Sequence, residues 1–190
     1  MQLARLSFLL AAAAAWSATA PAVAQTYTLD PAHSWVQFEV MHFGTSTTRG
    51  RLGPVSGTVT LDRPAGRGEV QVRVATASVD TGIGFFNARL RAADLLASEA
   101  HPEAFFVATQ WQFDGQKVAS VRGEFTLRGV SQPLTLRATQ FACRDTPEGE
   151  VCGGDFEGTL QRSDFGMDFG LPFVANRVGL RVQVEALRQR

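Results

Sequence analysis

The sequence is poor in the residues that carry most metal and acid–base chemistry. Among 190 residues there are three histidines, two cysteines, one tyrosine and a single lysine, Lys117. His33, His42 and His101 form no His-x-His or His-x3-His pair, whereas a zinc site needs three or four ligands in fixed geometry. The Gly-x-Ser-x-Gly elbow of acyl hydrolases is also missing. We therefore predict no metal centre and no catalytic residue.

The sequence also lacks an excess of charge of either sign. Lys plus Arg number 18, and Asp plus Glu number 18. Arg5 is the only charged residue among the first 24, so the rest of the chain has a net charge near −1. This balance gives no electrostatic reason to expect nucleic acid or an anionic membrane surface as a partner.

No hydrophobic run is long enough to cross a bilayer. The apolar run from Leu6 to Trp16 is shorter than the roughly 20 residues that a transmembrane helix needs. It follows Arg5 and precedes Ala22-Val23-Ala24, a small-residue cleavage pattern typical of a signal peptide. We expect residues 1–24 to be a signal peptide, residues 25–190 to form a single domain, and the mature protein to be exported without spanning the membrane.

The two cysteines, Cys143 and Cys152, are separated by eight residues. In an exported protein such a pair most simply forms a disulfide that closes a local loop. A redox-active pair is more typically Cys-x-x-Cys beside a helix. For so short a loop the chain-entropy model gives a stabilisation of about 2.5–3 kcal/mol.

What the sequence contains in abundance is an alternation of apolar and polar residues. Val36, Phe38 and Val40 alternate with polar side chains, which is the period of a strand with one buried face. The same alternation predicts eight strands, at residues 35–40, 55–61, 70–75, 105–113, 121–128, 134–138, 156–160 and 178–186. Residues 26–34 are interpreted as a short extended piece and a turn, and residues 44–51 as a loop or a weakly patterned strand end.

One segment has helical periodicity instead. Phe86, Leu90, Ala93 and Ala97 fall at i, i+4, i+7 and i+11, which predicts an amphipathic helix over about residues 85–97. It lies between the third and fourth strands, where it can cap an open end of the sheet. Eight short strands with mostly local connections favour an all-β antiparallel barrel or sandwich.

The side chains expected to face the interior are almost all apolar. They are Val36, Phe38, Val40, Val59, Leu61, Val72, Val74, Phe105, Val107, Trp111, Phe125, Leu127, Leu136, Leu160, Val182 and Val184. An eight-stranded barrel can be filled by its side chains or can hold one small ligand. Alternation alone does not choose between a dry core and an apolar cavity.

Four motifs stand out along the chain. They are Tyr27-Thr28-Leu29-Asp30-Pro31-Ala32-His33-Ser34, His42-Phe43-Gly44, Gly129-Val130-Ser131-Gln132-Pro133-Leu134 and Arg162-Ser163-Asp164-Phe165-Gly166. Taken in order, they resemble the successive signatures of the YceI-like family. Their order and spacing match from Tyr27 to Ala186. The resemblance implies an exported, periplasmic bacterial protein with an antiparallel eight-stranded lipocalin-like barrel that binds polyisoprenoids and related long-chain amphiphiles, including quinone-like lipids.

By this resemblance the interior becomes a tunnel for a prenyl or acyl tail, with the ligand's head group near the helix and loop end. The residues expected to line the tunnel are Val36, Phe38, Val40, Phe43, Phe86, Leu90, Leu95, Trp111, Phe125, Leu127, Phe165 and Phe169. The residues expected at the head group are Asn87, Arg89, Arg162 and Asp164. The resemblance implies no required cofactor beyond a bound lipid, and it implies that homodimers occur.

The family's usual Asp-x-His-Leu stands here as Asn87-Ala88-Arg89-Leu90. We hypothesise that Arg89, with Arg91, faces an anionic or carbonyl head group, because a guanidinium donates a planar fork of hydrogen bonds. The alternative places Arg89 in solvent on the outer helix face. Arg162 and Asp164 are interpreted either as a strand-end ion pair and turn cap or as groups at the cavity mouth.

Three functions follow from these observations, and the leading one is a lipid-binding module for carriage, storage or stress response. A long prenyl chain would bury several hundred Å² of apolar surface at about 25 cal/mol per Å², a gross gain well above ordinary association costs. The second is an enzyme that acts on a bound isoprenoid or quinone through His42 or through Arg162 and Asp164. The third is an interaction protein whose barrel is solid.

Overall fold

The computed structural model describes residues 24–189, so the predicted signal peptide lies outside the described residues except for Ala24. The strands are β1 (Gln25–Leu29), β2 (Trp35–His42), β3 (Ser46–Leu52), β4 (Val55–Asp62), β5 (Arg67–Ala75), β6 (Glu103–Asp114), β7 (Lys117–Leu127), β8 (Val130–Thr146), β9 (Gly149–Gln161) and β10 (Val174–Arg188). The helices are α1 (Gly84–Arg91) and the 3-10 turns η1 (Pro31–His33), η2 (Thr76–Ser78) and η3 (Arg162–Phe165).

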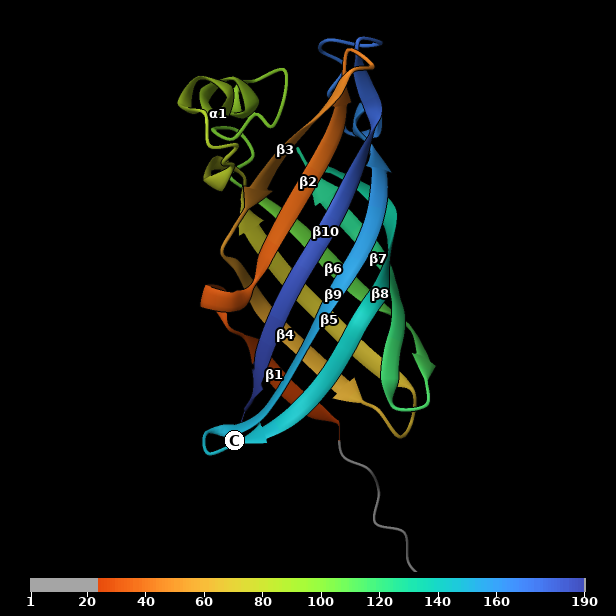
Figure 1. Cartoon of the computed structure of the whole chain (residues 1–190). Coiled ribbons are helices and arrows are strands. Elements are labelled where there is room, and N and C mark those ends of the chain that lie inside the picture. The colour runs from red at the N-terminus through yellow and green to blue at the C-terminus, as the bar shows by residue number, and fades with distance from the viewer. Residues whose placement is uncertain (1–23, 190) are drawn as a thin grey trace, which may run out of the picture.

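Eight of the strands close into an antiparallel barrel (Figure 1). The order around the ring is β1-β4-β5-β6-β7-β8-β9-β10, and the pairing of β1 with β10 completes it. The lower part of β10 pairs with β1 at Tyr27↔Arg188, while its upper part pairs with β2 from Gln183↔Trp35 onward. β2 and β3 therefore form a hairpin that extends the barrel wall along β10. The predicted eight-stranded antiparallel barrel is confirmed.

In three segments the structure has strands that are absent from the sequence prediction or longer than predicted. β1 has only five residues, too few for an alternation of apolar and polar residues to be recognised. β3 is polar on both faces and has no buried side chain, so it lacks this alternation. The disulfide closes a local loop as predicted, but this loop is the end of a hairpin, because Cys143 and Cys152 lie opposite each other in the β8–β9 ladder. That hairpin continues beyond them to Thr146↔Gly149.

In β6 the predicted inward face is wrong for the first half of the strand. Phe105 and Val107 are 40% and 46% exposed, whereas Ala104, Phe106 and Ala108 are buried. The β6–β7 register shifts between Ala108 and Gln110, and such a bulge inserts one residue and exchanges the two faces of the strand. Beyond the bulge, Trp111 packs against the core as predicted, and Phe113 also packs there.

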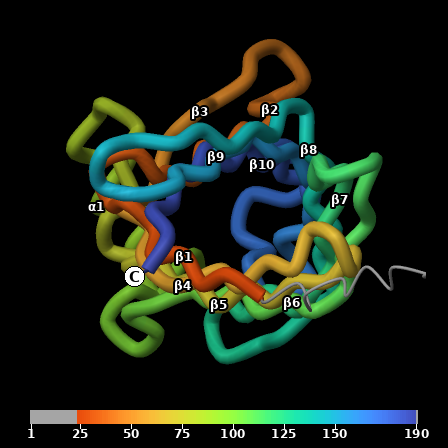
Figure 2. The backbone as a smooth tube through the Cα atoms, turned by 90° about the horizontal axis from the view of Figure 1, so that it is seen from below, coloured from red at the N-terminus to blue at the C-terminus, as the bar shows by residue number. Residues whose placement is uncertain are grey.

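The predicted helix over residues 85–97 is real but shorter, since α1 ends at Arg91 and Ala92 is extended. Phe85 is 75% exposed and Phe86 is 42% exposed, so the apolar stripe is not buried against the sheet. In Figures 1 and 2, α1 lies beside the barrel wall and does not extend across the barrel end. The apolar residues after the helix reach the core in turns, where Leu95 and Leu96 pack against it.

The segment after β9 closes the upper end of the barrel. Phe165 and Met167 are 3% and 7% exposed and belong to the same buried cluster as Leu127. The ring of Phe165 meets that of Phe125 edge-on, with 5.7 Å between centroids. In the view along the barrel, part of the chain between β9 and β10 lies within the outline of the ring (Figure 2). None of the helices among residues 24–189 has the length and apolar character of a membrane span.

Candidate functional site

An apolar cavity of about 90 Å³ lies on the barrel axis. All eight strands of the closed ring contribute to its wall, and β2 and β3 do not. The lining residues are Tyr27, Leu29, Val59, Leu61, Val70, Val72, Phe106, Trp111, Val121, Leu136, Phe141, Cys152, Gly153, Gly154, Phe156, Val182, Val184 and Ala186. The wall of this cavity is therefore apolar and offers few polar partners.

Trp111 occupies a defined place in this wall. A Cβ at Gly68 of β5 would lie 2.8 Å from Cε2 of Trp111, so the indole packs directly on the backbone of a strand that must carry glycine there. The ring stacks on Phe113 with 6.1 Å between centroids. The indole nitrogen Nε1 is buried and has no hydrogen-bond partner among the described residues.

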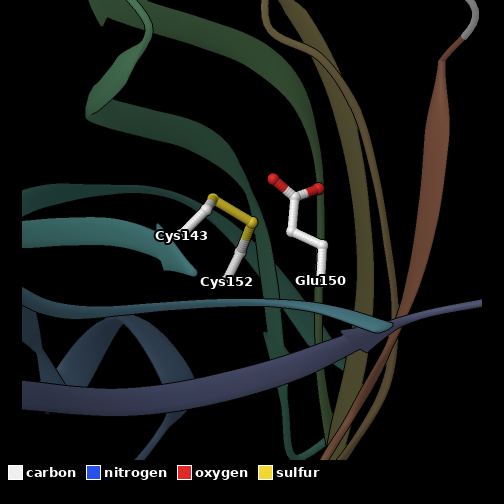
Figure 3. Close-up of side chains that lie close together, drawn as sticks. All are labelled: Cys143, Glu150 and Cys152. Carbon is white, nitrogen blue, oxygen red and sulfur yellow. A yellow bond between two sulfur atoms is a disulfide. The ribbon is translucent and has the colours of Figure 1, made fainter. Parts of the chain in front are cut away.

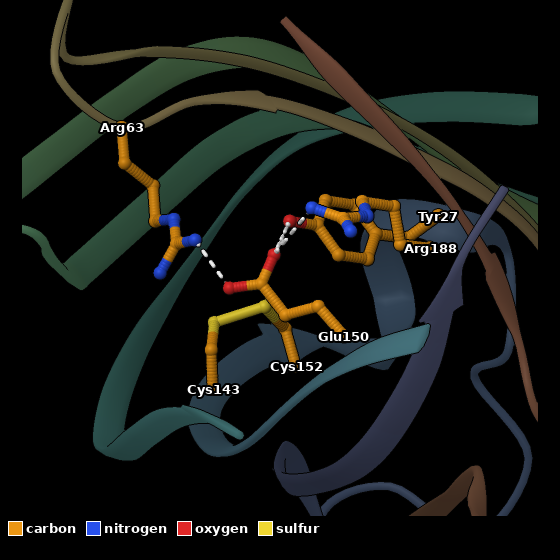
Figure 4. Close-up of a disulfide and its surroundings, with 6 residues drawn as sticks. All are labelled: Tyr27, Arg63, Cys143, Glu150, Cys152 and Arg188. Carbon is orange, nitrogen blue, oxygen red and sulfur yellow. Dashed lines mark hydrogen bonds and ion pairs between the residues drawn. A yellow bond between two sulfur atoms is a disulfide. The ribbon is translucent and has the colours of Figure 1, made fainter. Parts of the chain in front are cut away.

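Below the cavity, three polar side chains gather around the carboxylate of Glu150 (Figure 4). Tyr27 donates its hydroxyl to Oε2 of Glu150 at 2.7 Å, and Nη2 of Arg63 donates to Oε1 of Glu150 at 2.5 Å. Nη1 of Arg188 lies 3.8 Å from Oε2 of Glu150. Glu150 shares its face of β9 with Cys152, so the carboxylate points toward the interior and closes the lower end of the cavity with its partners.

The surroundings shift the pKa values of this cluster in opposite directions. Burial, together with the hydrogen bond to Glu150 and its negative charge, raises the pKa of Tyr27 to about 12. Burial alone would raise the pKa of Glu150, but the bonds from Tyr27 and Arg63 and the charges of Arg63 and Arg188 outweigh it, and the pKa is lowered. The pair is thus held as a neutral phenol and a carboxylate.

Because Tyr27 is the only tyrosine in the sequence, tyrosinate absorbance near 295 nm reports its titration directly. We expect a midpoint near pH 12 in the folded protein, against an ordinary value of 10.0. A folded pKa above the unfolded one stabilises the fold below about pH 10, and this stability is lost as the pH rises toward 12. Glu150→Gln should lower the midpoint only in part, because burial remains. A midpoint near 10 in the folded parent would contradict this description.

The disulfide adjoins the same carboxylate (Figure 3). Cys143 and Cys152 are bonded to each other, which confirms the predicted disulfide. Their sulfur atoms and a carboxylate oxygen of Glu150 lie within 4.8 Å of one another. Bonded sulfur atoms are not thiolates, which are the form that binds metal. The disulfide therefore acts here as part of the cavity wall, through Cys152.

The predicted tunnel residues fall into three groups in the structure. Trp111 lines the cavity. Six others pack against the core clusters without lining it: Val36, Phe38, Leu95, Phe125, Leu127 and Phe165. Five lie farther out, with Val40 and Leu90 partly buried and Phe43, Phe86 and Phe169 exposed. The cavity thus lies lower in the barrel than the predicted tunnel.

At the upper end, two predicted head-group residues are engaged within the protein. Arg89 donates from Nη1 and Nη2 to the two carboxylate oxygens of Asp94 at 2.7 and 2.6 Å, and its guanidinium lies 4.0 Å from the ring centroid of Phe169. The side-chain oxygen of Asn87 accepts from the backbone N–H of Thr81 at 2.8 Å. Both residues therefore hold α1 against the neighbouring segments.

The predicted ion pair between Arg162 and Asp164 is wrong. Arg162 is only 5% exposed and donates to backbone carbonyls, while Asp164 is exposed. The four carbonyl acceptors belong to Met167 at 2.5 Å and Phe169, Val174 and Ala175 at 2.9 Å each. Arg162 therefore anchors the segment that closes the upper end of the barrel.

Several cavity residues escape the sequence pattern. Phe106 falls on the outer face by alternation, because alternation does not reveal the β6 bulge. Gly153 and Gly154 line the cavity through their backbone, and two adjacent glycines in a strand pattern signal close backbone approach. Tyr27 stands in the first family motif, which is a signal that could single it out, but its partner Glu150 lies 123 residues away.

A closed antiparallel ring of eight strands with an apolar cavity on its axis places the chain among small cavity-forming β-barrels. More specifically, the chain belongs to the family of the YceI-like domain, which matches residues 27–186. The resemblance drawn from the four motifs is confirmed.

Relatives and solved structures agree with this assignment. The chain is 34% identical over 174 residues to Protein YceI of Escherichia coli O157:H7, covering 89% of this chain and 90% of that protein. The crystal structure of Burkholderia cenocepacia BcnA superposes with a TM-score of 0.69 at 23% identity, covering 83% of this chain and 98% of BcnA. A polyisoprenoid binding domain from Saccharophagus degradans, implicated in plant cell wall breakdown, has a TM-score of 0.63 at 16% identity, covering 86% and 98%.

Proposed function

We propose that the protein holds a polyisoprenoid, a quinone-like lipid or another long-chain amphiphile in the barrel, for carriage, storage or a stress response. The observation that carries this proposal is the apolar cavity on the axis, whose wall draws on every strand of the closed ring. Apolar ligands gain about 25 cal/mol per Å² of surface removed from water. The description of a similar fold from Saccharophagus degradans as a polyisoprenoid binding domain supports the same ligand class.

The present cavity is smaller than such a ligand. Its volume is about 90 Å³, whereas sites for drug-sized ligands occupy about 300–1,000 Å³. A long chain must therefore displace side chains that now fill the axis. Many inward apolar residues, such as Val36, Phe38 and Phe125, are only partly buried, so rearranging them costs less than opening a close-packed core.

Export to the periplasm is part of the proposal. It rests on the sequence of residues 1–24, with one arginine, an apolar run and a small-residue cleavage pattern. The Cys143–Cys152 disulfide supports it, because disulfides persist in oxidising compartments such as the periplasm.

One observation favours a second candidate, an interaction protein with a solid barrel. That observation is the small cavity volume. The remaining hypothesis, an enzyme acting on a bound isoprenoid or quinone, would need polar groups at the ligand. The cavity wall is almost wholly apolar, and among its residues the Tyr27 hydroxyl is already bonded to Glu150 while Nε1 of Trp111 is buried.

Native mass spectrometry of the mature protein, purified from the periplasm of its own host, tests the proposal. Organic extraction then identifies any bound lipid. We expect a co-purifying prenyl chain, quinone or fatty amide. A protein that is empty and also fails to take up added prenyl lipid is a solid barrel, and turnover of the bound lipid would identify an enzyme.

A further inference from the structure

We infer that the upper end of the barrel docks on a lipid bilayer through five exposed phenylalanines, and that the lipid ligand passes between bilayer and barrel at this end. The inference rests on the proposed function, because it assigns the source of the same ligand and the end by which it enters. The five residues, here called the aromatic rim, are Phe43, Phe85, Phe86, Phe169 and Phe173.

The first observation is that exposed aromatic side chains gather at one end of the molecule. Six phenylalanines are exposed among residues 24–189, and all but Phe105 belong to the aromatic rim. The five come from three segments: the turn between β2 and β3, α1, and the segment between β9 and β10. All three segments lie near the upper end of the barrel (Figure 1). Single exposed apolar side chains are normal, whereas a patch of them marks an interaction site.

Contacts among the three segments hold the aromatic rim together. The backbone N–H of Phe43 donates to the carbonyl of Phe173 at 2.7 Å, and the two rings stack with 5.8 Å between centroids. The guanidinium of Arg89 in α1 lies 4.0 Å from the ring centroid of Phe169, which joins α1 to the segment between β9 and β10. Phe43 and Phe173 are nevertheless 59% and 63% exposed. The patch is thus formed in the protein alone and faces outward.

The second observation is the backbone conformation of Phe43. Phe43 and Gly44 have φ angles of 51° and 67°, in a tight turn closed by the N–H of Thr45 on the carbonyl of His42 at 3.1 Å. Hairpin turns with two positive φ angles favour Asn-Gly, because the left-handed region is unfavourable for a bulky side chain. The chain carries an exposed phenylalanine there instead. Strain of this kind, without burial of the ring, points to a role at the surface.

The third observation is that the two ends of the barrel differ in chemistry. Below the cavity, Arg63 and Arg188 lie beside the carboxylate of Glu150, which also accepts a hydrogen bond from Tyr27. A hydrocarbon chain that entered there would have to separate paired charges in partly buried surroundings, which is costly. Entry from the upper end meets apolar side chains instead.

The segment between β9 and β10 closes the upper end and also carries part of the aromatic rim. Its Phe165 and Met167 are buried in the same cluster as Leu127. Its Phe169 and Phe173 are exposed. A bilayer that takes up the exposed rings therefore contacts the same segment that a ligand entering at this end must displace.

The chemistry of the ligand and the charge of the patch point to a bilayer as the partner. A long-chain amphiphile exposes a large apolar surface in water, so it resides in membranes and is taken up where the barrel touches one. The three segments, residues 43–45, 84–94 and 162–173, carry as many acidic as basic side chains. These are Arg89, Arg91, Arg162, Asp94, Asp164 and Asp168. A patch without net charge suits zwitterionic head groups, and its binding depends on the apolar area that it buries.

Flotation of the mature protein with vesicles of phosphatidylcholine and phosphatidylethanolamine, which carry no net charge, tests the inference. We expect the parent to float with the vesicles. Raising NaCl from about 0.1 M to about 0.5 M should leave this binding unchanged, because salt screens charges and not apolar contacts. The double variant Phe43→Asn, Phe173→Asn should bind about tenfold more weakly or worse, since two largely exposed rings no longer enter the bilayer.

Phe105→Asn is the matched control, because Phe105 is 40% exposed in β6 and lies outside the aromatic rim. It should bind vesicles like the parent. Phe85→Asn is a second test variant that alters neither the β2–β3 turn nor the closing segment. Phe85 is 75% exposed, so the variant should fold normally and bind vesicles about threefold more weakly.

Uptake of geranylgeraniol, a polyisoprenoid alcohol, separates docking from ligand binding. Added from ethanol to protein without vesicles, it should bind the parent and the double variant alike, because Phe43 and Phe173 do not line the cavity. Supplied in the same neutral vesicles, it should load the parent faster than the double variant.

The failures are distinguishable. A parent that takes up geranylgeraniol but does not float with vesicles overturns the inference alone. So does vesicle binding that is lost at about 0.5 M NaCl or that the double variant retains. Dimers that depend on the aromatic rim, seen by sedimentation velocity without vesicle binding, would identify a second copy of the chain as the partner and also overturn it. A parent that takes up no geranylgeraniol by either route overturns the proposed function, and with it the passage of ligand at this end.

Discussion

Replacing Arg162 with methionine is expected to lower the free energy of unfolding by about 3–5 kcal/mol. The substitution keeps much of the side-chain volume but removes a buried guanidinium that donates to four backbone carbonyls. Hydrogen bonds to charged groups contribute about 1.5–3 kcal/mol each, not additively, and acceptors left buried without a donor add a penalty. Urea unfolding of the mature protein, followed by circular dichroism, measures the change.

Arg122→Met is the matched control for Arg162→Met. Arg122 is exposed on β7, so its loss should change the free energy of unfolding by no more than about 0.5 kcal/mol. A loss of less than about 1 kcal/mol in Arg162→Met would mean that the closing segment holds its shape without this anchor.

The second large effect is expected at the disulfide. Replacing Cys143 and Cys152 together with alanine should lower the free energy of unfolding by about 2.5–3 kcal/mol, because the unfolded chain is no longer constrained by a short covalent loop. The parent in dithiothreitol should show the same loss, measured from the urea midpoint, and the double variant should be indifferent to the reductant. Equal midpoints for the oxidised and reduced parent would show that the β8–β9 ladder alone holds this hairpin end.

The closed barrel could be predicted from the sequence because strand alternation is a local signal. Val178 to Ala186 shows it over a long run, and the structure places this run in β10 as expected. Which side chains face the barrel interior was harder to predict from this alternation. Phe105 and Val107 look like core residues on alternation, but one inserted residue near Thr109 exchanges the faces. A bulge depends on how β6 meets β7, and no single-strand pattern contains that information.

The residues of the candidate site could likewise be predicted from the sequence only in part. Trp111 is expected from alternation to line the interior, and it does so. Arg162 and Asp164 are close in sequence, which suggests an ion pair, but the acceptors of Arg162 are carbonyls up to 13 residues downstream, on a segment that folds back over it. Tyr27, Arg63, Glu150 and Arg188 come from distant segments, so only the tertiary fold brings them together.

β10 pairs with β1 in its lower part and with β2 in its upper part, so the β2–β3 hairpin can detach while the ring stays closed. The ring is complete without β2 and β3, because β1 closes it against the lower part of β10. The β2–β3 hairpin is attached through the upper part of β10 and through the Arg51↔Asp80 bridge. Its amides can therefore exchange with deuterium through detachment of the hairpin, while amides of the ring must wait for the whole barrel to unfold.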